Sequence, residues 1–245
     1  MKFSLVIPLW NEGHNVETLV EVISKSGLHQ AGMNELVLVN NGSNDNTAEL
    51  VNIVANKYEW ILPVHLPVNL NYGGGVYEGF KYAHEDIFCY IPGDLQVLPD
   101  DVLKIFNFYK ENSHKAQIFV KGNRVKRYDS RQNQFVSSVY TWLANRFLGL
   151  RVKDVNGLPK MFSRELVDLI PAERMKSFVF DSQLLSVARK NNWKIYEVGV
   201  TFHARREGVS SWSKKRLRIY LQVLTQILRL RKLRNEPGVK LNRIE

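Results

Sequence analysis

The chain has 245 residues, of which 44% are apolar, so it is long enough to bury a full hydrophobic core. Its single cysteine, Cys89, excludes an internal disulfide and is typical of a protein in a reducing cytoplasm. The formal net charge is +10, but residues 205–245 alone contain twelve basic and three acidic residues. This uneven charge argues against a domain that coats nucleic acid over its whole face, and it predicts an anionic partner for the C-terminal tail.

Apolar, β-branched runs alternate with segments of helical periodicity through the first half of the chain. These runs are continuous rather than alternating, as expected for strands of a parallel sheet with both faces covered. The order of elements predicts an α/β fold with a doubly wound, mostly parallel sheet flanked by helices. The expected strands are 3–9, 36–40, 61–66, 88–91 and 118–120, and the expected helices are 16–26, 47–56, 76–83 and 102–110.

The second half of the chain is less regular. We expect helices over 134–148 and 181–190, short strands over 160–162 and 195–200, and a last helix over 213–233. The pattern predicts one catalytic domain over residues 1–212 and a basic, amphipathic tail over residues 213–245.

Each of the first four predicted strands is followed by a cluster of polar residues and glycines. In a doubly wound sheet, ligands bind beyond the carboxyl ends of the strands, so these clusters meet at the binding edge. A turn explains any one cluster alone, whereas four at one edge predict a nucleotide site. The clusters lie at residues 8–12, 40–47, 71–75 and 92–96.

In this order the clusters resemble the motifs of glycosyltransferase family 2, whose members have a GT-A fold. The segment Pro8-Leu9-Trp10-Asn11-Glu12 is similar to the family's Pro-x-Tyr-Asn-Glu. Residues 40–47 are similar to Asp-Asp-Gly-Ser-x-Asp-x-Thr, with Asn40 and Asn41 in place of both acids. Asp94-Leu95-Gln96 resembles the end of Asp-Ala-Asp-Leu-Gln, with Pro92 where the first Asp would stand.

Two later motifs extend the resemblance to about residue 215. Residues 180–185 are similar to Phe-Asp-x-Glu-Leu-Leu, with Gln183 in the Glu position, and residues 206–210 match Arg-x-Gly-x-Ser. The branch that the chain resembles most is that of the dolichyl- and polyprenyl-phosphate sugar transferases. The resemblance implies an inverting transferase that uses a nucleoside-diphosphate sugar, with UDP or GDP as the nucleotide.

The resemblance implies a donor site at the strand ends. The candidate nucleotide-sugar-binding residues are Pro8, Trp10, Glu12, Asn41, Gly74 and Asp94. Asparagine can accept and donate hydrogen bonds, so binding at Asn41 survives the replacement of the acid. The alternative for residues 40–47 is a turn followed by a helix cap.

The departing diphosphate requires neutralisation, for which Mg²⁺ or Mn²⁺ held by oxygen ligands is the usual device. Asp94 is the candidate principal ligand and Gln96 the second, and because Pro92 removes a carboxylate we expect the metal to be bound weakly. The Arg206 guanidinium is a second candidate catalytic group, since it can hold phosphate oxygens with or without a metal. His203 is more simply interpreted as structural.

The kind of acceptor determines which groups must assist its attack on the sugar. A hydroxyl acceptor needs a general base, for which Asp181 is the candidate, whereas a lipid phosphate is already ionised and needs cations. The candidate cations follow the fifth predicted strand or lie in the cleft that the resemblance implies, and a charged loop facing water is the alternative. They are Arg124, Arg127, Arg131 and Lys160, with Asp154 expected in the same cleft.

In the tail, Leu217, Leu221, Leu224 and Leu228 repeat at helical spacing between two basic ends. The apolar run is too short to span a bilayer, so we expect an interfacial helix on anionic lipids, and a packing or oligomer-forming helix is the alternative. We therefore expect a cytoplasmic protein that is peripheral on the inner face of the membrane, with no nucleic acid partner. A second copy of the chain is a further candidate partner.

Three functions remain open on the sequence. The favoured one is transfer of a sugar to a polyprenyl phosphate or lipid-linked glycan. The second is transfer to a soluble or polysaccharide hydroxyl with Asp181 as base. The third is a degenerate protein that binds the nucleotide sugar without turnover, because Asn40, Asn41, Pro92 and Gln183 all replace acids.

Overall fold

The computed structural model describes residues 1–115, 117–170, 179–204 and 225. The expected tail helix and the Arg-x-Gly-x-Ser segment lie outside these residues. Seven strands form one sheet in the order β3-β2-β1-β4-β6-β5-β7. The strands are β1 (Phe3–Leu9), β2 (Met33–Asn41), β3 (Ile61–Leu66), β4 (Ile87–Tyr90), β5 (Ile118–Arg127), β6 (Lys160–Ser163) and β7 (Lys194–Phe202).

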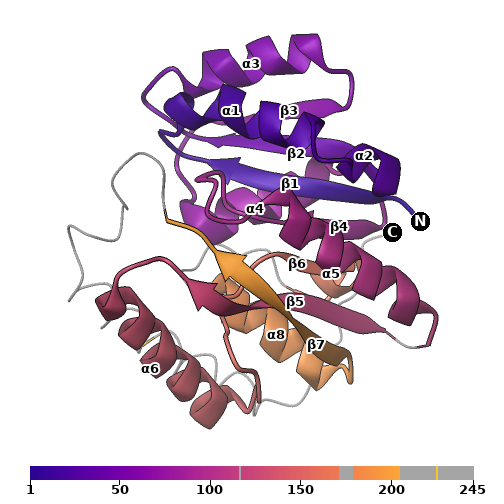
Figure 1. Cartoon of the computed structure of the whole chain (residues 1–245), viewed down its shortest axis with the longest axis vertical. Helices are drawn as coiled ribbons and strands as arrows, with labels where there is room; N and C mark the ends of the chain where they lie inside the picture. Colours follow the sequence, from indigo (N-terminus) through magenta and orange to yellow (C-terminus); the bar gives the residue numbers. More distant parts are fainter. Residues whose placement is uncertain (116, 171–178, 205–224, 226–245) are drawn as a thin grey trace.

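The sheet is mostly parallel, as predicted from the continuous apolar runs. β1 pairs in parallel with β2 and β4, β2 with β3, and β5 with β7, whereas β6 runs antiparallel to both β4 and β5. All seven residues of β1 are buried, because this central strand is covered on both faces. β6 therefore joins two parallel groups of strands into one sheet (Figure 1).

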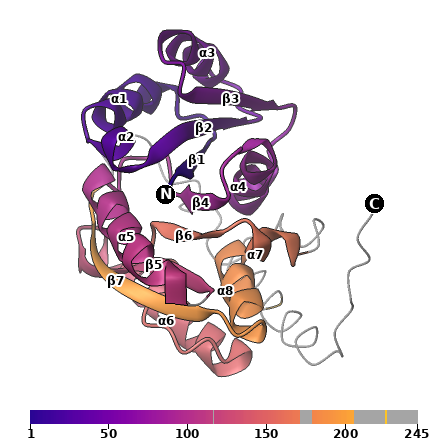
Figure 2. The same cartoon turned by 90° about the vertical axis from the view of Figure 1, so that its right-hand side faces the viewer.

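Helices cover both faces of the sheet. α1, α2 and α5 lie on one face and α4, α7 and α8 on the other, while α3 packs against α1 (Figure 2). α6 lies at the periphery, beyond β5 and β7 (Figure 1). The helices are α1 (Gly13–Ser24), α2 (Leu28–Ala31), α3 (Thr47–Lys57), α4 (Asn71–Tyr82), α5 (Pro99–Asn112), α6 (Arg131–Leu148), α7 (Glu165–Asp168) and α8 (Phe180–Lys190), with a 3₁₀ turn at Ser113–Lys115.

Two elements differ from their predicted bounds in a way that affects the site. α4 begins at Asn71, so the three glycines at 73–75 lie in its first turns and are buried rather than forming a loop. A Cβ atom at Gly75 would lie 2.9 Å from Asn41 Nδ2 and 3.1 Å from Pro8 Cβ, so only glycine lets the helix approach β1 and β2 this closely. β5 continues to Arg127, because β7 pairs with it along its whole length. Arg124 and Arg127 are thus strand residues, and Arg131 is the first residue of α6.

Candidate active site

The carboxyl ends of β1 and β4 diverge where the strand order reverses. β4 pairs only with Ser4–Val6 of β1, and the last bond between them runs from Ile91 N–H to Val6 C=O, 3.3 Å. The backbone nitrogen of Pro8, two residues after Val6, faces β4 in the same way, but proline has no N–H to donate. The missing donor therefore falls where no strand remains to accept it. The two ends mark the point at which doubly wound sheets bind ligands, which we call the crevice.

Hydrogen bonds hold together the loops that follow β1 and β2. Asn11 N–H donates to Ser43 Oγ at 3.0 Å, and Asn44 N–H donates to Asn11 Oδ1 at 2.8 Å. Asn11 has a left-handed backbone with φ of 53°, which asparagine adopts more readily than most residues. Asp45 also joins these loops by accepting from Gly13 N–H at 3.2 Å. The first two motif clusters therefore form one surface.

Trp10 and Glu12 lie on this surface. The Trp10 side chain is exposed, which leaves its ring available to a nucleoside. Glu12 accepts from Asn15 Nδ2 at 2.6 Å, and its own N–H donates to Thr47 Oγ1 at 3.1 Å. The structure thus brings these two candidates together with the loops after β1 and β2.

Asn40 and Asn41 are both engaged within the protein. Asn41 Oδ1 accepts from Leu70 N–H at 3.0 Å and its Nδ2 donates to the Asn71 carbonyl at 2.9 Å, so Asn41 fixes the start of α4. Asn40 Oδ1 accepts from Ser43 N–H at 3.2 Å. A carboxylate at position 41 has no donor for the Asn71 carbonyl, so the amide found here performs a task that the acid cannot.

Asp94 and Gln96 lie in the loop after β4. Asp94 is buried and its Oδ1 accepts from Gln96 N–H at 3.2 Å, with Leu95 between them at a left-handed φ of 58°. Gln96 Nε2 donates to the His203 carbonyl at 3.0 Å, and His203 N–H donates to the Gln96 carbonyl at 2.9 Å. The end of β7 is therefore tied to this loop.

These donors fit a divalent ion only in part. Across the described residues, no three His, Cys, Asp or Glu side chains lie close enough to hold a metal. Asp94 and Gln96 supply one carboxylate and one amide oxygen, both hard ligands suited to Mg²⁺ or Mn²⁺. Such an ion would complete its shell with oxygens of the bound diphosphate. Arg206 lies outside the described residues.

Asp181, at the start of α8, is held by two donors. Lys160 Nζ donates to Asp181 Oδ1 at 2.7 Å, and the Tyr90 hydroxyl donates to the same oxygen at 2.6 Å. The Lys160 side chain is completely buried, and burial lowers its pKa while the adjacent Asp181 carboxylate raises it. Asp181 is therefore the counter-ion of a buried lysine.

Tyr72, in the first turn of α4, has a buried hydroxyl without a hydrogen-bond partner within the described part of the chain. Burial raises the pKa of Tyr72, and the negative charges of Asp181 and Asp94 raise it further.

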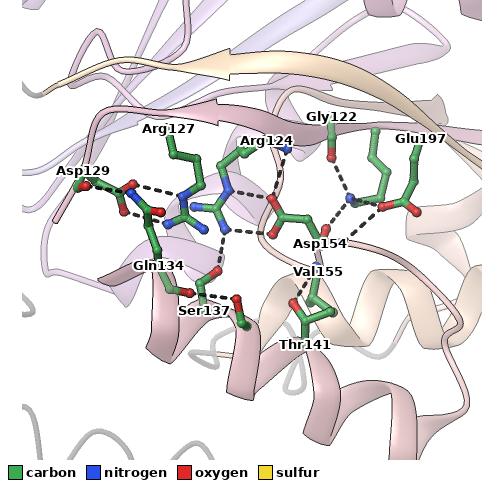
Figure 3. Close-up of polar contacts among 12 residues, drawn as sticks. Gly122, Arg124, Arg127, Asp129, Gln134, Ser137, Thr141, Asp154, Val155 and Glu197 are labelled. Atoms are coloured by element: carbon green, nitrogen blue, oxygen red, sulfur yellow. Dashed lines mark hydrogen bonds and ion pairs between the residues drawn. The ribbon is translucent and has the colours of Figure 1, made fainter. Parts of the chain in front are cut away.

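A second charged cluster, at the end of β5, surrounds Arg124 (Figure 3). Arg124 Nε and Nη2 donate to the two oxygens of Asp154 at 2.6 and 2.8 Å, and Nη2 also donates to Ser137 Oγ at 2.6 Å. The Asp154 carboxyl is buried, which opposes its ionisation, but these bonds and the Arg124 charge hold its pKa well below its usual range. Arg127 forms a similar fork with Asp129 at 3.0 and 2.6 Å.

The two guanidinium groups share one aromatic support. Their Cζ atoms lie 5.1 Å (Arg124) and 5.9 Å (Arg127) from the ring centroid of Phe202, the last residue of β7. Both line a polar cleft of about 170 Å³ between β5 and α6, with Lys153 as a third cation. The structure therefore places two of the four predicted acceptor residues side by side. Arg131 is exposed on α6, and Lys160 lies with Asp181.

Lys121 joins the two charged clusters and was not identified from the sequence. Its buried Nζ donates to Glu197 Oε1 at 3.1 Å and to the carbonyls of Gly122 and Asp154. It stands opposite Lys160 in the pairing of β5 with β6. Burial, with a smaller effect from the Lys160 charge, lowers the pKa of Lys121 to about 8. In the sequence, Lys121 is marked only as a charged residue directly after the apolar run 118–120, and nothing marks Glu197, Ser137 or Phe202.

Comparison with known proteins identifies the relatives of this chain. Residues 4–170 match the glycosyl transferase family 2. An undecaprenyl-phosphate 4-deoxy-4-formamido-L-arabinose transferase of Pseudomonas aeruginosa is 26% identical over 87% of this chain and 61% of its own length. A dolichol-phosphate mannosyltransferase of Pyrococcus furiosus is 26% identical over 94% of this chain and 64% of its own length. The chain thus spans about three fifths of the length of these curated relatives.

A solved structure shares the fold. Glucosyl-3-phosphoglycerate synthase from Mycobacterium tuberculosis, in complex with Mn²⁺, uridine diphosphate and phosphoglyceric acid, superposes with a TM-score of 0.69 at 19% identity. The match covers 97% of this chain and 80% of the synthase. The predicted GT-A-like architecture is therefore confirmed for the sheet and its helices. No helix among the described residues is long and apolar enough to cross a membrane.

Proposed function

The chain belongs to glycosyl transferase family 2, and from that premise we propose that it transfers a sugar from a nucleoside-diphosphate sugar to a polyprenyl phosphate at the cytoplasmic face of a membrane. A phosphate oxygen of the acceptor attacks the anomeric carbon as the bond from that carbon to the diphosphate breaks. The nucleoside diphosphate leaves, and the sugar configuration inverts. No proton has to be removed from an ionised phosphate.

The observation that carries this proposal is the pair of guanidinium groups in the cleft at the end of β5. Arg124 and Arg127 stand over one ring, and the Nε and Nη2 groups of each are held by a carboxylate, so both cations are positioned before any ligand arrives. A guanidinium has five N–H donors, and those outside the fork on the carboxylate would bind the phosphate oxygens. The names of the relatives point to the same acceptor class, since two of them act on undecaprenyl and dolichol phosphates.

The state of Asp181 favours this acceptor over a hydroxyl. A general base must be free to take a proton from the acceptor. Asp181 instead accepts bonds from Lys160 and Tyr90 at its Oδ1 and balances a buried ammonium group. Its role in the proposal is to hold Lys160, and through it the floor of the crevice.

The donor half of the proposal uses the crevice between β1 and β4. The nucleoside binds across Pro8, Trp10, Glu12 and Asn41, beside Gly74, and α4 packs closely on Pro8 and Asn41 through Gly75. Asp94 and Gln96 would hold Mg²⁺ or Mn²⁺, and such an ion would neutralise the diphosphate leaving group when bound. Because the described chain offers one carboxylate here, the metal is weakly held and depends on the nucleotide.

Two variants separate the donor half of the site from the acceptor half. Asp94→Asn should lower both donor hydrolysis and sugar transfer by at least about a hundredfold, the scale of losing one electrostatic contact in a reacting site. Arg127→Gln should spare donor hydrolysis and raise the KM for the acceptor phosphate at least about tenfold. Equal loss of both reactions in the Arg127→Gln variant would show that the cleft does not serve the acceptor.

A further inference from the structure

The outer face of α6 carries large apolar side chains in water. Phe135, Val139 and Trp142 are exposed by 70%, 40% and 63%, and their spacing of four and three residues places them in one row along the helix. We call these three residues the α6 stripe. An isolated apolar residue on a surface needs no explanation, whereas a row that contains a Phe and a Trp marks an interaction surface.

α6 is nevertheless packed against the rest of the molecule. On its inner face Ala144 and Leu148 are buried, and the Tyr140 hydroxyl shares a hydrogen bond of 2.5 Å with Ser182 Oγ of α8. The helix also begins with a side-chain cap, in which Ser130 accepts from Asn133 N–H at 3.3 Å. The inner face of α6 therefore holds the helix in place, while its outer face exposes the apolar stripe.

The charges around the stripe select the partner. α6 contains no acidic residue, and Arg131 and Arg146 continue the row of the stripe by four residues at either end. Both arginines are exposed. Aromatic residues in the middle of a helix face with arginines at its ends are typical of helices that lie in the interface of an anionic membrane.

The position of the stripe relative to the cleft supplies a second argument. Gln134, Ser137 and Thr141 of α6 line the cleft of Arg124 and Arg127. Each of them is within two residues of a member of the stripe along the helix. The cleft and the stripe thus lie on adjacent faces of α6, which is at the edge of the molecule (Figure 1). A helix lying in the headgroup layer through the stripe would hold the cleft at the depth of lipid phosphates.

We propose that the α6 stripe is a membrane-contacting surface that seats the cleft of Arg124 and Arg127 on an anionic lipid bilayer. The proposal rests on the proposed function, because it assigns a position to the lipid acceptor of that same site. It requires no contribution from residues 205–245.

The test measures partition of the full-length protein onto vesicles of phosphatidylglycerol and phosphatidylcholine, and onto vesicles of phosphatidylcholine alone. The triple variant Phe135→Ser, Val139→Ser, Trp142→Ser should bind the anionic vesicles at least about tenfold more weakly than the wild type. A matched control, Ile53→Ser, Val68→Ser, Tyr82→Ser, removes three side chains of similar exposure from the other half of the molecule and should stay within about twofold. Binding of the donor nucleotide should be unchanged in both variants, which shows that they fold.

A spectroscopic measurement locates the contact. Brominated lipids should quench part of the wild-type tryptophan fluorescence, and Trp142→Phe should bind equally well but lose that part. Unchanged partition of the stripe variant would overturn the proposal, and if that variant were also monomeric where the wild type is dimeric, the stripe would be an interface between two copies. Stripe-dependent binding without sugar transfer to any polyprenyl phosphate would refute the proposed function and leave the membrane surface standing.

Discussion

On the proposed donor side of the sheet edge, the loops after β1 and β2 are joined mainly by amides, hydroxyls and backbone N–H groups, with Asp45 as the one carboxylate named there. On the proposed acceptor side, β5 and β6 are instead tied to neighbouring segments by buried ion pairs. Asn11 and Asn41 represent the first region, and the pairs of Lys160 with Asp181 and of Arg124 with Asp154 represent the second. Neutral amides hold their geometry at any pH and suit the polar edge of a nucleoside. Buried cations with fixed counter-ions suit a phosphate that must enter without deforming the site.

The difference also concerns how stability is distributed. A hydrogen bond between neutral groups contributes about 1 kcal/mol net, so the donor loops tolerate change at single positions. Removing one member of a buried ion pair leaves an uncompensated charge, which costs several times more. The acceptor side is therefore the region where single substitutions should unfold the protein most readily.

The largest effect is expected at Lys160. Lys160→Met should lower the free energy of unfolding by about 3–5 kcal/mol, because Asp181 then keeps its charge in a largely buried position without its cation and with only the Tyr90 hydroxyl beside it. Urea denaturation measures this change. Lys81→Met, which breaks an exposed pair with Glu78, is the matched control and should cost less than about 1 kcal/mol. The double variant Lys160→Met, Asp181→Asn should recover part of the loss, and no recovery would mean that charge is not the cause.

A smaller effect is expected at Asn41. Asn41→Asp restores the acid of the family motif but places a carboxylate oxygen next to the Asn71 carbonyl, where neither group can donate a hydrogen bond. We therefore expect the free energy of unfolding to fall by about 1–3 kcal/mol. Thermal unfolding of the ligand-free protein measures it. Asn44→Asp, at an exposed position of the same loop, should change stability by less than about 0.5 kcal/mol. Equal effects of the two substitutions would show that Asn41 does not fix the start of α4.

The smallest effect concerns pH and the far edge of the donor half. Glu35 is buried there, and although burial opposes ionisation, hydrogen bonds from Ser4 Oγ at 2.5 Å and from His84 lower its pKa. A lowered folded pKa means that the stabilisation is complete above the unfolded value of about 4.3 and is lost as the pH falls through the folded value. Glu35→Gln should therefore show a shallower loss of stability between pH 6 and 3 than the wild type. Parallel slopes in urea titrations at these pH values would contradict the assignment.

The sequence predicted the donor half of the fold more closely than the acceptor half. β1 and β3 have the bounds expected from their apolar runs, because buried parallel strands are continuous in hydrophobicity. β5 continues seven residues beyond its apolar run, since pairing with β7 rather than burial determines where it ends. The local sequence did not predict that β6 runs antiparallel, because a strand of four residues has too short a pattern to indicate its direction.

The site shows the same division. The motif clusters predicted which loops meet at the crevice, and their order along the chain was sufficient because consecutive βα units place them together. The partners of the acceptor cations come from distant segments, as with Lys121 and Glu197, which are 76 residues apart. Glycine is rare inside helices, so the three glycines predict a loop, whereas they lie in α4 and one of them, Gly75, packs closely on Pro8 and Asn41. Arg206 and the tail lie outside the described residues, so their predicted roles remain predictions.

The most direct test of the central proposal compares two acceptors that differ by one phosphate. The full-length protein is incubated with a labelled UDP- or GDP-sugar and Mn²⁺, and with either a short-chain polyprenyl phosphate or the corresponding polyprenol. We predict a labelled sugar phosphate lipid with the first acceptor, no product with the second, and loss of the product in the Arg127→Gln variant. Transfer to the polyprenol at a comparable rate, abolished by Asp181→Asn, would contradict the proposal and assign the chain to the transferases that use hydroxyl acceptors.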